Sequence, residues 1–99
     1  MTIEENIRNF IVENFIFEPG QGNFDNTQSF LETGIIDSTG MLELVSFIED
    51  TYTIKMADEE LIPDNLDSVN NVVRYIERKL GNRVQAWGKS NYKLLIINY

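Results

Sequence analysis

One serine in this 99-residue chain stands where its hydroxyl group is well placed for chemistry. Ser38 directly follows Asp37 in the run from Gly34 to Leu44, and aspartate is a residue that commonly caps the beginning of a helix. Ser38 then falls in the first helical turn, where backbone N–H groups lack partners and added negative charge is tolerated. We therefore interpret Ser38 as a site of covalent modification and not as a catalytic nucleophile.

The composition excludes several classes of active site. The chain has no histidine and no cysteine, so serine–histidine and cysteine–histidine catalysis within the chain are excluded, as are zinc sites of the usual ligand types. No stretch has the spacing of an EF-hand. We predict a protein that has no metal site. The lack of cysteine, of a signal peptide and of a long apolar run favours a cytoplasmic protein without a membrane span.

The charge is distributed unevenly along the chain. Residues 1–80 carry 16 acidic and 5 basic side chains, a net of −11, whereas residues 81–99 carry 3 basic and no acidic side chains, which together give the net of −8. An acidic body is repelled by nucleic acid and attracted to basic protein surfaces. The charge therefore predicts protein partners and no nucleic acid, although simple solubility also explains it.

The spacing of apolar residues predicts an all-α fold with three main helices and one short helix. Thr2 and Glu5 have the spacing of a capping box at the start of the first helix, and Pro19-Gly20 follows its end. Residues 18–36 read as a long loop, which we expect to be anchored to the core by its apolar residues. These residues are Phe24, Phe30, Leu31, Ile35 and Ile36.

The second helix is predicted from Ser38 to about Thr51. At about 100° per residue, one stripe of this helix is apolar and faces the core; it comprises Met41, Leu44, Val45, Ile48 and Tyr52. A flank beside that stripe carries Thr39, Leu42, Ser46 and Glu49, and Phe47 lies on the opposite flank. Leu42 is thus an apolar residue off the core stripe, and its position beside Ser38 makes it a candidate partner contact.

The rest of the chain is predicted to form a short helical turn from Asp58 that is stopped by Pro63, and then a final helix from about Asp67. Its inward residues are Val69, Val72, Val73, Ile76 and Leu80, and Gly81 is expected to follow its C-terminus. Residues 82–99 differ, because a polar stretch leads into the apolar, strand-like run 92–99. We expect this tail to pack on the body, with Phe47 and Tyr75 as docking points, or on another copy, unless it is foreign to the domain.

Over about residues 2–80 the chain resembles the acyl and peptidyl carrier proteins, which are small acidic helical bundles. In that family an Asp-Ser pair begins the second helix and a Glu-Leu pair follows within it, as Asp37-Ser38 and Glu43-Leu44 do here. The resemblance implies an acyl-carrier-like four-helix bundle, with a carrier domain over residues 1–81 and an atypical extension over 82–99. Thr39 replaces the leucine that follows the serine in typical fatty-acid carriers. The form Ile36-Asp37-Ser38-Thr39 looks more like stand-alone carriers served by an adenylating ligase.

The resemblance also implies a function, a cofactor and partners, and a protein that is not itself an enzyme. A phosphopantetheinyl transferase would attach 4′-phosphopantetheine to Ser38, an ATP-dependent acyl or aminoacyl ligase would load it, and a downstream acyl-accepting enzyme would unload it. Acidic residues of the second helix and of Asp58–Glu60 would meet basic residues on these partners. The partner-binding candidates are Thr39, Leu42, Glu43, Ser46 and Glu49.

Two interpretations from other functional classes remain. One is an unmodified helical adaptor that binds a partner through the Leu42 flank. The other is a small hydrolase that uses Ser38, which the lack of histidine opposes.

Overall fold

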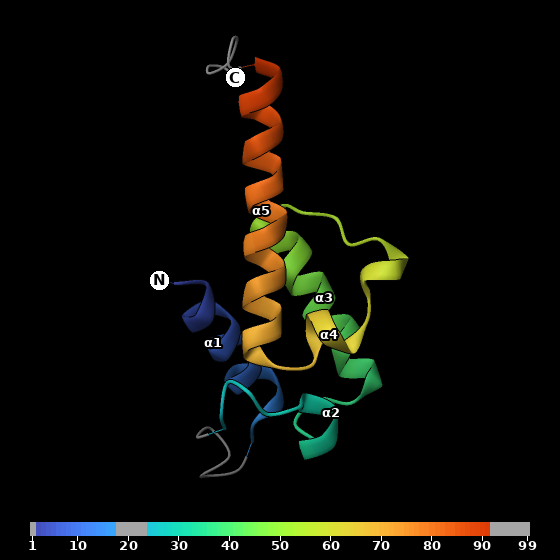
Figure 1. Ribbon diagram of the computed structural model, residues 1–99. Coiled ribbons are helices and arrows are strands. Elements are labelled where there is room, and N and C mark those ends of the chain that lie inside the picture. The colour runs from blue at the N-terminus through green and yellow to red at the C-terminus, as the bar shows by residue number, and fades with distance from the viewer. Residues whose placement is uncertain (1, 18–23, 92–99) are drawn as a thin grey trace.

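The computed structural model describes residues 2–17 and 24–91, with side chains described as far as Gly81. Figure 1 shows the described part of the chain as an arrangement of helices, and no strand occurs within it. The elements are α1 (Ile3–Phe15), α2 (Phe30–Thr33), α3 (Ser38–Tyr52), the 3₁₀ turn η2 (Asp58–Glu60), α4 (Pro63–Leu66) and α5 (Val69–Asn91). The predicted all-α class with three main helices is confirmed. No described helix is both long and apolar enough to cross a membrane.

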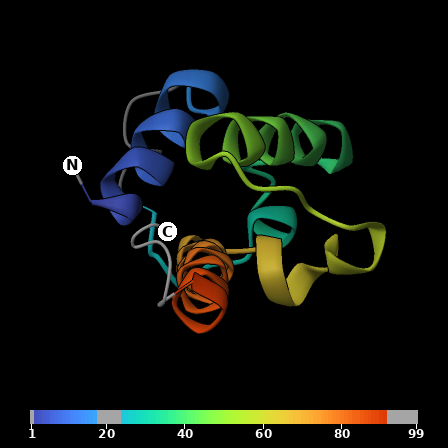
Figure 2. The ribbon, with the colours of Figure 1, turned by 90° about the horizontal axis from the view of Figure 1, so that it is seen from above.

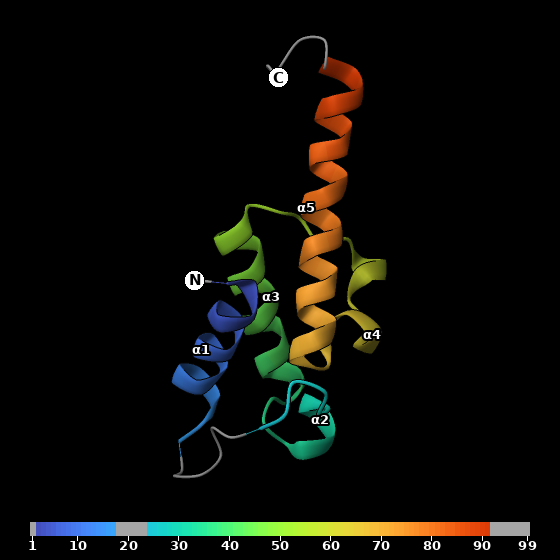
Figure 3. The same cartoon turned by 60° about the vertical axis from the view of Figure 1, so that its left-hand side comes forward.

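The other elements are arranged around α5, which is the longest helix. It packs against α1 and α4. Figure 2 looks down α5 and shows α1 and α3 together on one side of it, with α4 beside it. The C-terminal part of α5 extends beyond the other helices in Figures 1 and 3.

The core forms where the apolar stripes of α1, α3 and α5 meet. The stripe predicted for the second helix is confirmed, because Leu44 and Ile48 are fully buried and Met41, Val45 and Tyr52 pack partly buried against them. Fully buried side chains from the other elements complete this core: Ile7, Ile11, Phe30, Ile36, Val69, Val72, Tyr75 and Ile76.

The beginning of α1 is fixed by the capping box that the sequence predicts. The Glu5 N–H donates to the Thr2 hydroxyl oxygen at 3.1 Å, and the Thr2 N–H donates to the Glu5 carboxylate at 3.0 Å. Both backbone N–H groups therefore gain partners that the helix itself does not supply. Pro19-Gly20 lies outside the described residues.

The segment predicted as one long loop contains a helical turn, α2. Ser29 caps it by accepting a hydrogen bond from the Glu32 N–H at 3.0 Å, and Gly34 ends it in the left-handed conformation with φ 78°. Phe24, Phe30 and Ile36 are buried as expected, whereas Leu31 is 44% exposed and does not anchor the segment. Successive side chains on a helix point about 100° apart, so Leu31 points outward when Phe30 is buried.

Asp67 ties α2 to the start of α5. Its backbone carbonyl accepts a hydrogen bond from the Phe30 N–H at 2.8 Å, and its carboxylate accepts one from the Leu31 N–H at 3.0 Å. The Ser29 hydroxyl also donates to this carboxylate. These bonds satisfy the N-terminal N–H groups of α2 and fix where Leu31 lies.

Two predicted helix boundaries near the C-terminus are wrong. Pro63 does not stop a helical turn but begins α4, because the first helical position needs no N–H donor and proline already has the required φ. Gly81 does not follow the end of the last helix, since α5 continues through it to Asn91 and Gly81 lacks the left-handed φ of a C′ residue.

Tyr75 and Phe47, the two expected docking points of the tail, differ in exposure. Tyr75 is fully buried and cannot receive the tail, so that expectation is wrong. Phe47 is half-buried and stacks on Phe10, with 4.2 Å between the ring centroids. The apolar run 92–99 lies outside the described residues.

Candidate functional site

Asp37 and Ser38 form the N-terminus of α3 as the sequence predicts. Asp37 has an extended backbone, and its carboxylate accepts a hydrogen bond from the Gly40 N–H at 2.7 Å. Ser38 is the first helical residue and is exposed. Among the described residues nothing hydrogen-bonds to the Ser38 hydroxyl, and no acidic residue shares the first turn of α3. The hydroxyl is therefore accessible at a helix end that favours added negative charge.

Gly40 allows this turn to pack closely against the end of α1, a feature that the sequence interpretation missed. A Cβ at position 40 would lie 2.7 Å from Phe15 Cε1 and 3.0 Å from Ile36 Cγ2. Gly40 is buried, so α1 supports the turn that presents Ser38. The signal in the sequence was a glycine within an otherwise regular helical pattern.

An apolar hollow of about 270 Å³ lies beside Ser38, and we call it the serine-side hollow. It is bordered by α2, α3, α4 and the segment between η2 and α4. Its lining consists of Leu31, Ser38, Met41, Leu42, Val45, Leu61, Ile62, Pro63 and Leu66. Apart from Ser38 these are apolar side chains, so the hollow can shelter an apolar group from water. The sequence interpretation missed it because its walls come from segments far apart in the chain.

Glu60 holds the wall of this hollow that carries Leu61 and Ile62. Its carboxylate accepts hydrogen bonds from the Ala57 N–H at 2.9 Å, from the Tyr75 hydroxyl at 2.9 Å and from Lys79 Nζ at 3.1 Å. The Ala57 N–H, followed by Lys79 and Tyr75, lowers the pKa of the Glu60 carboxyl against the effect of burial. Burial, and then the bond to Glu60, raises the pKa of Tyr75. Glu60–Lys79 is the only ion pair among the described side chains.

Four of the five predicted partner-binding residues lie together on α3. Thr39, Leu42, Glu43 and Ser46 are exposed, Leu42 by 63%. With Phe10, Asn14 and Phe47 they line a second, open hollow of about 480 Å³, which we call the aromatic hollow. Leu42 lines both hollows and therefore separates them.

Glu49, the fifth candidate, is not part of this group. It is half-buried, and its carboxylate accepts a hydrogen bond from the Met56 N–H at 2.8 Å. The link after α3 folds back past this side chain and needs an acceptor for its backbone N–H. Glu49 thus has a structural contact that its position on the helix did not predict.

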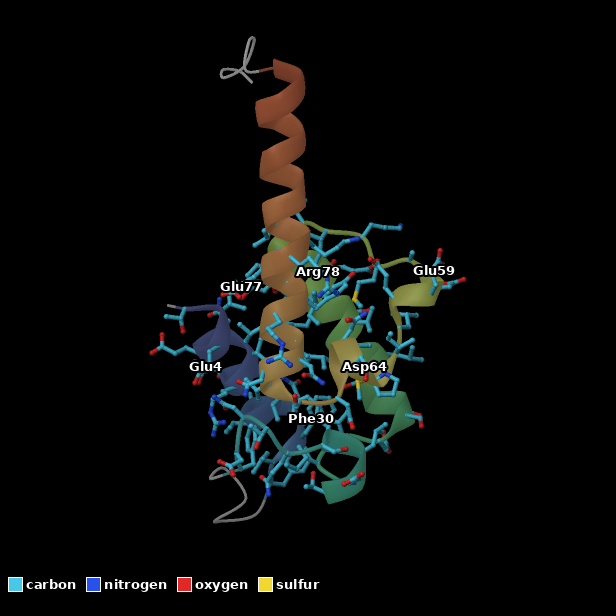
Figure 4. All side chains as sticks on the ribbon, viewed as in Figure 1. Glu4, Phe30, Glu59, Asp64, Glu77 and Arg78 are labelled. Atoms are coloured by element: carbon cyan, nitrogen blue, oxygen red, sulfur yellow. The ribbon has the colours of Figure 1, made fainter. Side chains whose placement is uncertain are left out.

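The charged side chains of α3 are acidic. α3 carries Glu43, Glu49 and Asp50 and no basic residue. Figure 4 shows Glu4 and Glu59 pointing outward on opposite sides of the body. No cluster of three or more potential metal-ligating side chains occurs among the described residues.

Comparison with known proteins places this arrangement in a family. No protein-family model matches the sequence. The chain is 36% identical over 80 residues to the acyl carrier protein of Akkermansia muciniphila, which covers 81% of this chain and 95% of the relative. It is 32% identical over 77 residues to the acyl carrier protein of Wolinella succinogenes, which covers 78% of this chain and 96% of the relative. With this similarity over nearly the full length of both relatives, and with its all-helical fold, the chain belongs to the acyl carrier protein family.

Proposed function

We propose that this chain is a stand-alone carrier that holds a small carboxylic or amino acid on 4′-phosphopantetheine attached to Ser38. The observation that carries this proposal is the exposed Ser38 hydroxyl at the capped N-terminus of α3. Family membership supports the carrier role in general, and with it a protein that is not itself an enzyme.

The residues around Ser38 fit the attachment of this group. A phosphodiester on the Ser38 oxygen would add negative charge at the N-terminus of α3, where Asp37 accepts from the Gly40 N–H and the first turn itself contains no acidic side chain. When bound, the arm supplies a terminal thiol that carries the acid as a thioester, so the chain itself needs no cysteine. The chain has no histidine to remove the Ser38 proton, and the transferase must therefore provide that base.

The proposal also gives a role to the serine-side hollow, which is to shelter part of the arm or of the carried acid from water. Its volume of about 270 Å³ and its apolar lining suit a small apolar portion of the arm or of the carried acid. Leu31, Leu61 and Ile62 are 38–44% exposed at this hollow, and covering them would remove apolar surface from water. Glu60 supports the wall on which Leu61 and Ile62 stand.

The partners in this proposal are a phosphopantetheinyl transferase, an ATP-dependent ligase and a downstream acyl-accepting enzyme. They would meet the exposed side chains Thr39, Leu42, Glu43 and Ser46 on α3. Exposed ion pairs contribute only about 0–1 kcal/mol each, so such docking is weak and reversible. Weak docking suits a carrier that must leave one enzyme for the next.

The alternative is an unmodified adaptor that acts only through protein contacts. The exposed Leu42, which separates two hollows, is the observation that favours it. The two functions differ in whether Ser38 is covalently changed.

Loading by candidate ligases tests the carrier function. The protein carrying the arm is incubated with ATP, a ligase and a candidate acid, and its intact mass is measured. A carrier gains the mass of the acid less water, and this gain disappears on treatment with hydroxylamine, which cleaves thioesters. Ser38→Ala should gain neither arm nor acid. Failure of the wild-type protein to accept the arm would favour the adaptor.

A further inference from the structure

Two aromatic rings line the aromatic hollow, and none of the functions above explains them. The rings of Phe10, on α1, and Phe47, on α3, lie 4.2 Å apart between centroids and 17° from parallel. Both are half-buried, and both line the hollow. Phe15 and Phe10 make a T-shaped contact with 5.8 Å between their ring centroids, and this contact holds the Phe10 ring in place. Two stacked rings are thus held in the lining of an open depression.

The rim of the hollow supplies hydrogen-bond acceptors. The Asn14 amide nitrogen donates to the Phe10 carbonyl at 2.9 Å, which leaves the Asn14 oxygen as an acceptor. Glu43 is exposed on the α3 side of the rim. Among the described side chains none is paired with the Glu43 carboxylate, and no basic residue lines the hollow.

Aromatic surface bordered by a carboxylate and an amide oxygen is suited to a cation, and more to a guanidinium than to an ammonium group. A guanidinium is planar, stacks on aromatic rings and donates several hydrogen bonds in one plane. An ammonium is more strongly hydrated and does not stack. The charge of the lining agrees, because Glu43 is the one charged residue among the described residues that line the hollow.

We propose that the aromatic hollow receives an arginine side chain of the enzyme that modifies Ser38. This inference rests on the proposed function. Thr39 lines the hollow and directly follows Ser38, so an arginine there lies close to the hydroxyl on which the transferase must act. Of the proposed partners, the transferase is the one that acts on the Ser38 oxygen itself, whereas a ligase acts at the far end of the arm. Docking of the transferase therefore uses α1, through Phe10 and Asn14, as well as α3.

The first test uses a small probe. A peptide, acetyl-Ala-Arg-Leu-amide, and its citrulline counterpart are titrated into the full chain while backbone amide signals are followed by NMR. The arginine peptide should shift the signals of Asn14, Glu43 and Phe47 and bind at least about fivefold more tightly, since citrulline has the same shape without the charge. Equal binding of the two peptides, or shifts confined to other residues, would overturn the proposal.

The second test measures the rate at which a broad-specificity transferase modifies variants of two exposed asparagines on α1. Asn14 lines the hollow and Asn9 does not, so Asn14→Lys and Asn9→Lys make the same charge change at matched sites. Asn14→Lys should slow modification about fivefold, because its amine can occupy the hollow beside Glu43, while Asn9→Lys should slow it less than about twofold. Asn14→Asp should instead speed modification.

The outcomes separate this inference from the proposed function. A folding defect cannot explain opposite effects of Asn14→Lys and Asn14→Asp, and circular dichroism checks that each variant keeps its helices. If the wild-type chain is modified but all three variants react at its rate, the aromatic hollow is not a docking site and the carrier function stands. If the wild-type chain is never modified, the proposed function itself is wrong.

Discussion

The Tyr75 hydroxyl donates a 2.9 Å hydrogen bond to Glu60, although the Tyr75 side chain is otherwise fully enclosed by the core. This bond joins the N-terminal half of α5 to the turn η2. Leu61 and Ile62, which follow Glu60, form part of the serine-side hollow. The contact between Tyr75 and Glu60 therefore connects the stability of the core with the shape of the site beside Ser38.

Tyr75→Phe should lower the free energy of unfolding by about 1 kcal/mol, because one hydrogen bond is lost while the buried ring keeps its volume. Urea denaturation of both proteins measures the difference. The double variant with Glu60→Gln gives the coupling between the two side chains. A fully additive double variant would show that the hydroxyl and the carboxylate do not interact.

Acid should weaken the attachment of η2. The folded protein lowers the pKa of Glu60 below its ordinary value of 4.5, chiefly through the Ala57 N–H. Its contribution to stability is therefore complete above pH 4.5 and is lost as the pH falls through the lowered pKa. Between pH 5 and pH 3 the Tm of the wild-type protein should fall more steeply than that of Glu60→Gln, as followed by circular dichroism. Parallel profiles would contradict this role of Glu60.

Gly40→Ala should destabilise the fold by about 1–3 kcal/mol, because the new methyl group would overlap the ring of Phe15 and crowd Ile36. Gly81→Ala is the matched control. A Cβ at Gly81 meets nothing within 4 Å, and alanine in a helix interior is favoured over glycine by about 0.5–1 kcal/mol. Unfolding in urea should move in opposite directions for the two variants. Destabilisation by Gly81→Ala would show instead that the helix ends there.

Leu42→Asp and Glu43→Lys should slow the modification of Ser38 with little change in Tm, because both side chains are exposed. Val12→Asp and Glu77→Lys make the same changes at exposed positions on α1 and α5 and serve as controls. Added salt should slow modification of the wild-type protein through screening. Loading of both α3 variants at the wild-type rate would show that partners dock elsewhere.

Truncation after Gly81 should leave a folded chain whose Ser38 is still modified. The described core ends at Ile76, with Leu80 packed against it, so a complete set of core residues is retained. Circular dichroism, sedimentation and the rate of Ser38 modification give the three measurements. Loss of helical structure would show that residues 82–99 are part of the domain, and dissociation of an oligomer would show that they join copies of the chain.

Capping residues and apolar periodicity made much of the fold predictable from the sequence. Thr2 and Asp37 fix the beginnings of α1 and α3 through local hydrogen bonds, and such signals need no tertiary information. The short helix α2 carried a similar signal, since Ser29 and Gly34 flank it, but the surrounding glycines and asparagines suggested a loop. Pro63 and Gly81 were misread because each residue type permits more than one role in a helix.

The candidate site was only partly predictable. Asp37 and Ser38 are adjacent in the chain, so a local pattern was enough to predict that they begin a helix and to propose them as the site. The bond from Tyr75 to Glu60, the stacking of Phe10 on Phe47 and the contact of Glu49 with Met56 depend on how separate elements meet. Periodicity shows which face of a helix is apolar but not which distant segment covers it.

Attachment of phosphopantetheine to Ser38 is the central claim, and peptide mapping after modification tests it most directly. The full chain is incubated with coenzyme A, Mg²⁺ and a broad-specificity transferase, digested, and analysed by mass spectrometry, with Ser38→Ala as the control. We predict one phosphopantetheine group per chain, located on Ser38, and none on the variant. An unmodified wild-type chain, or a group mapped to another residue, would contradict the assignment.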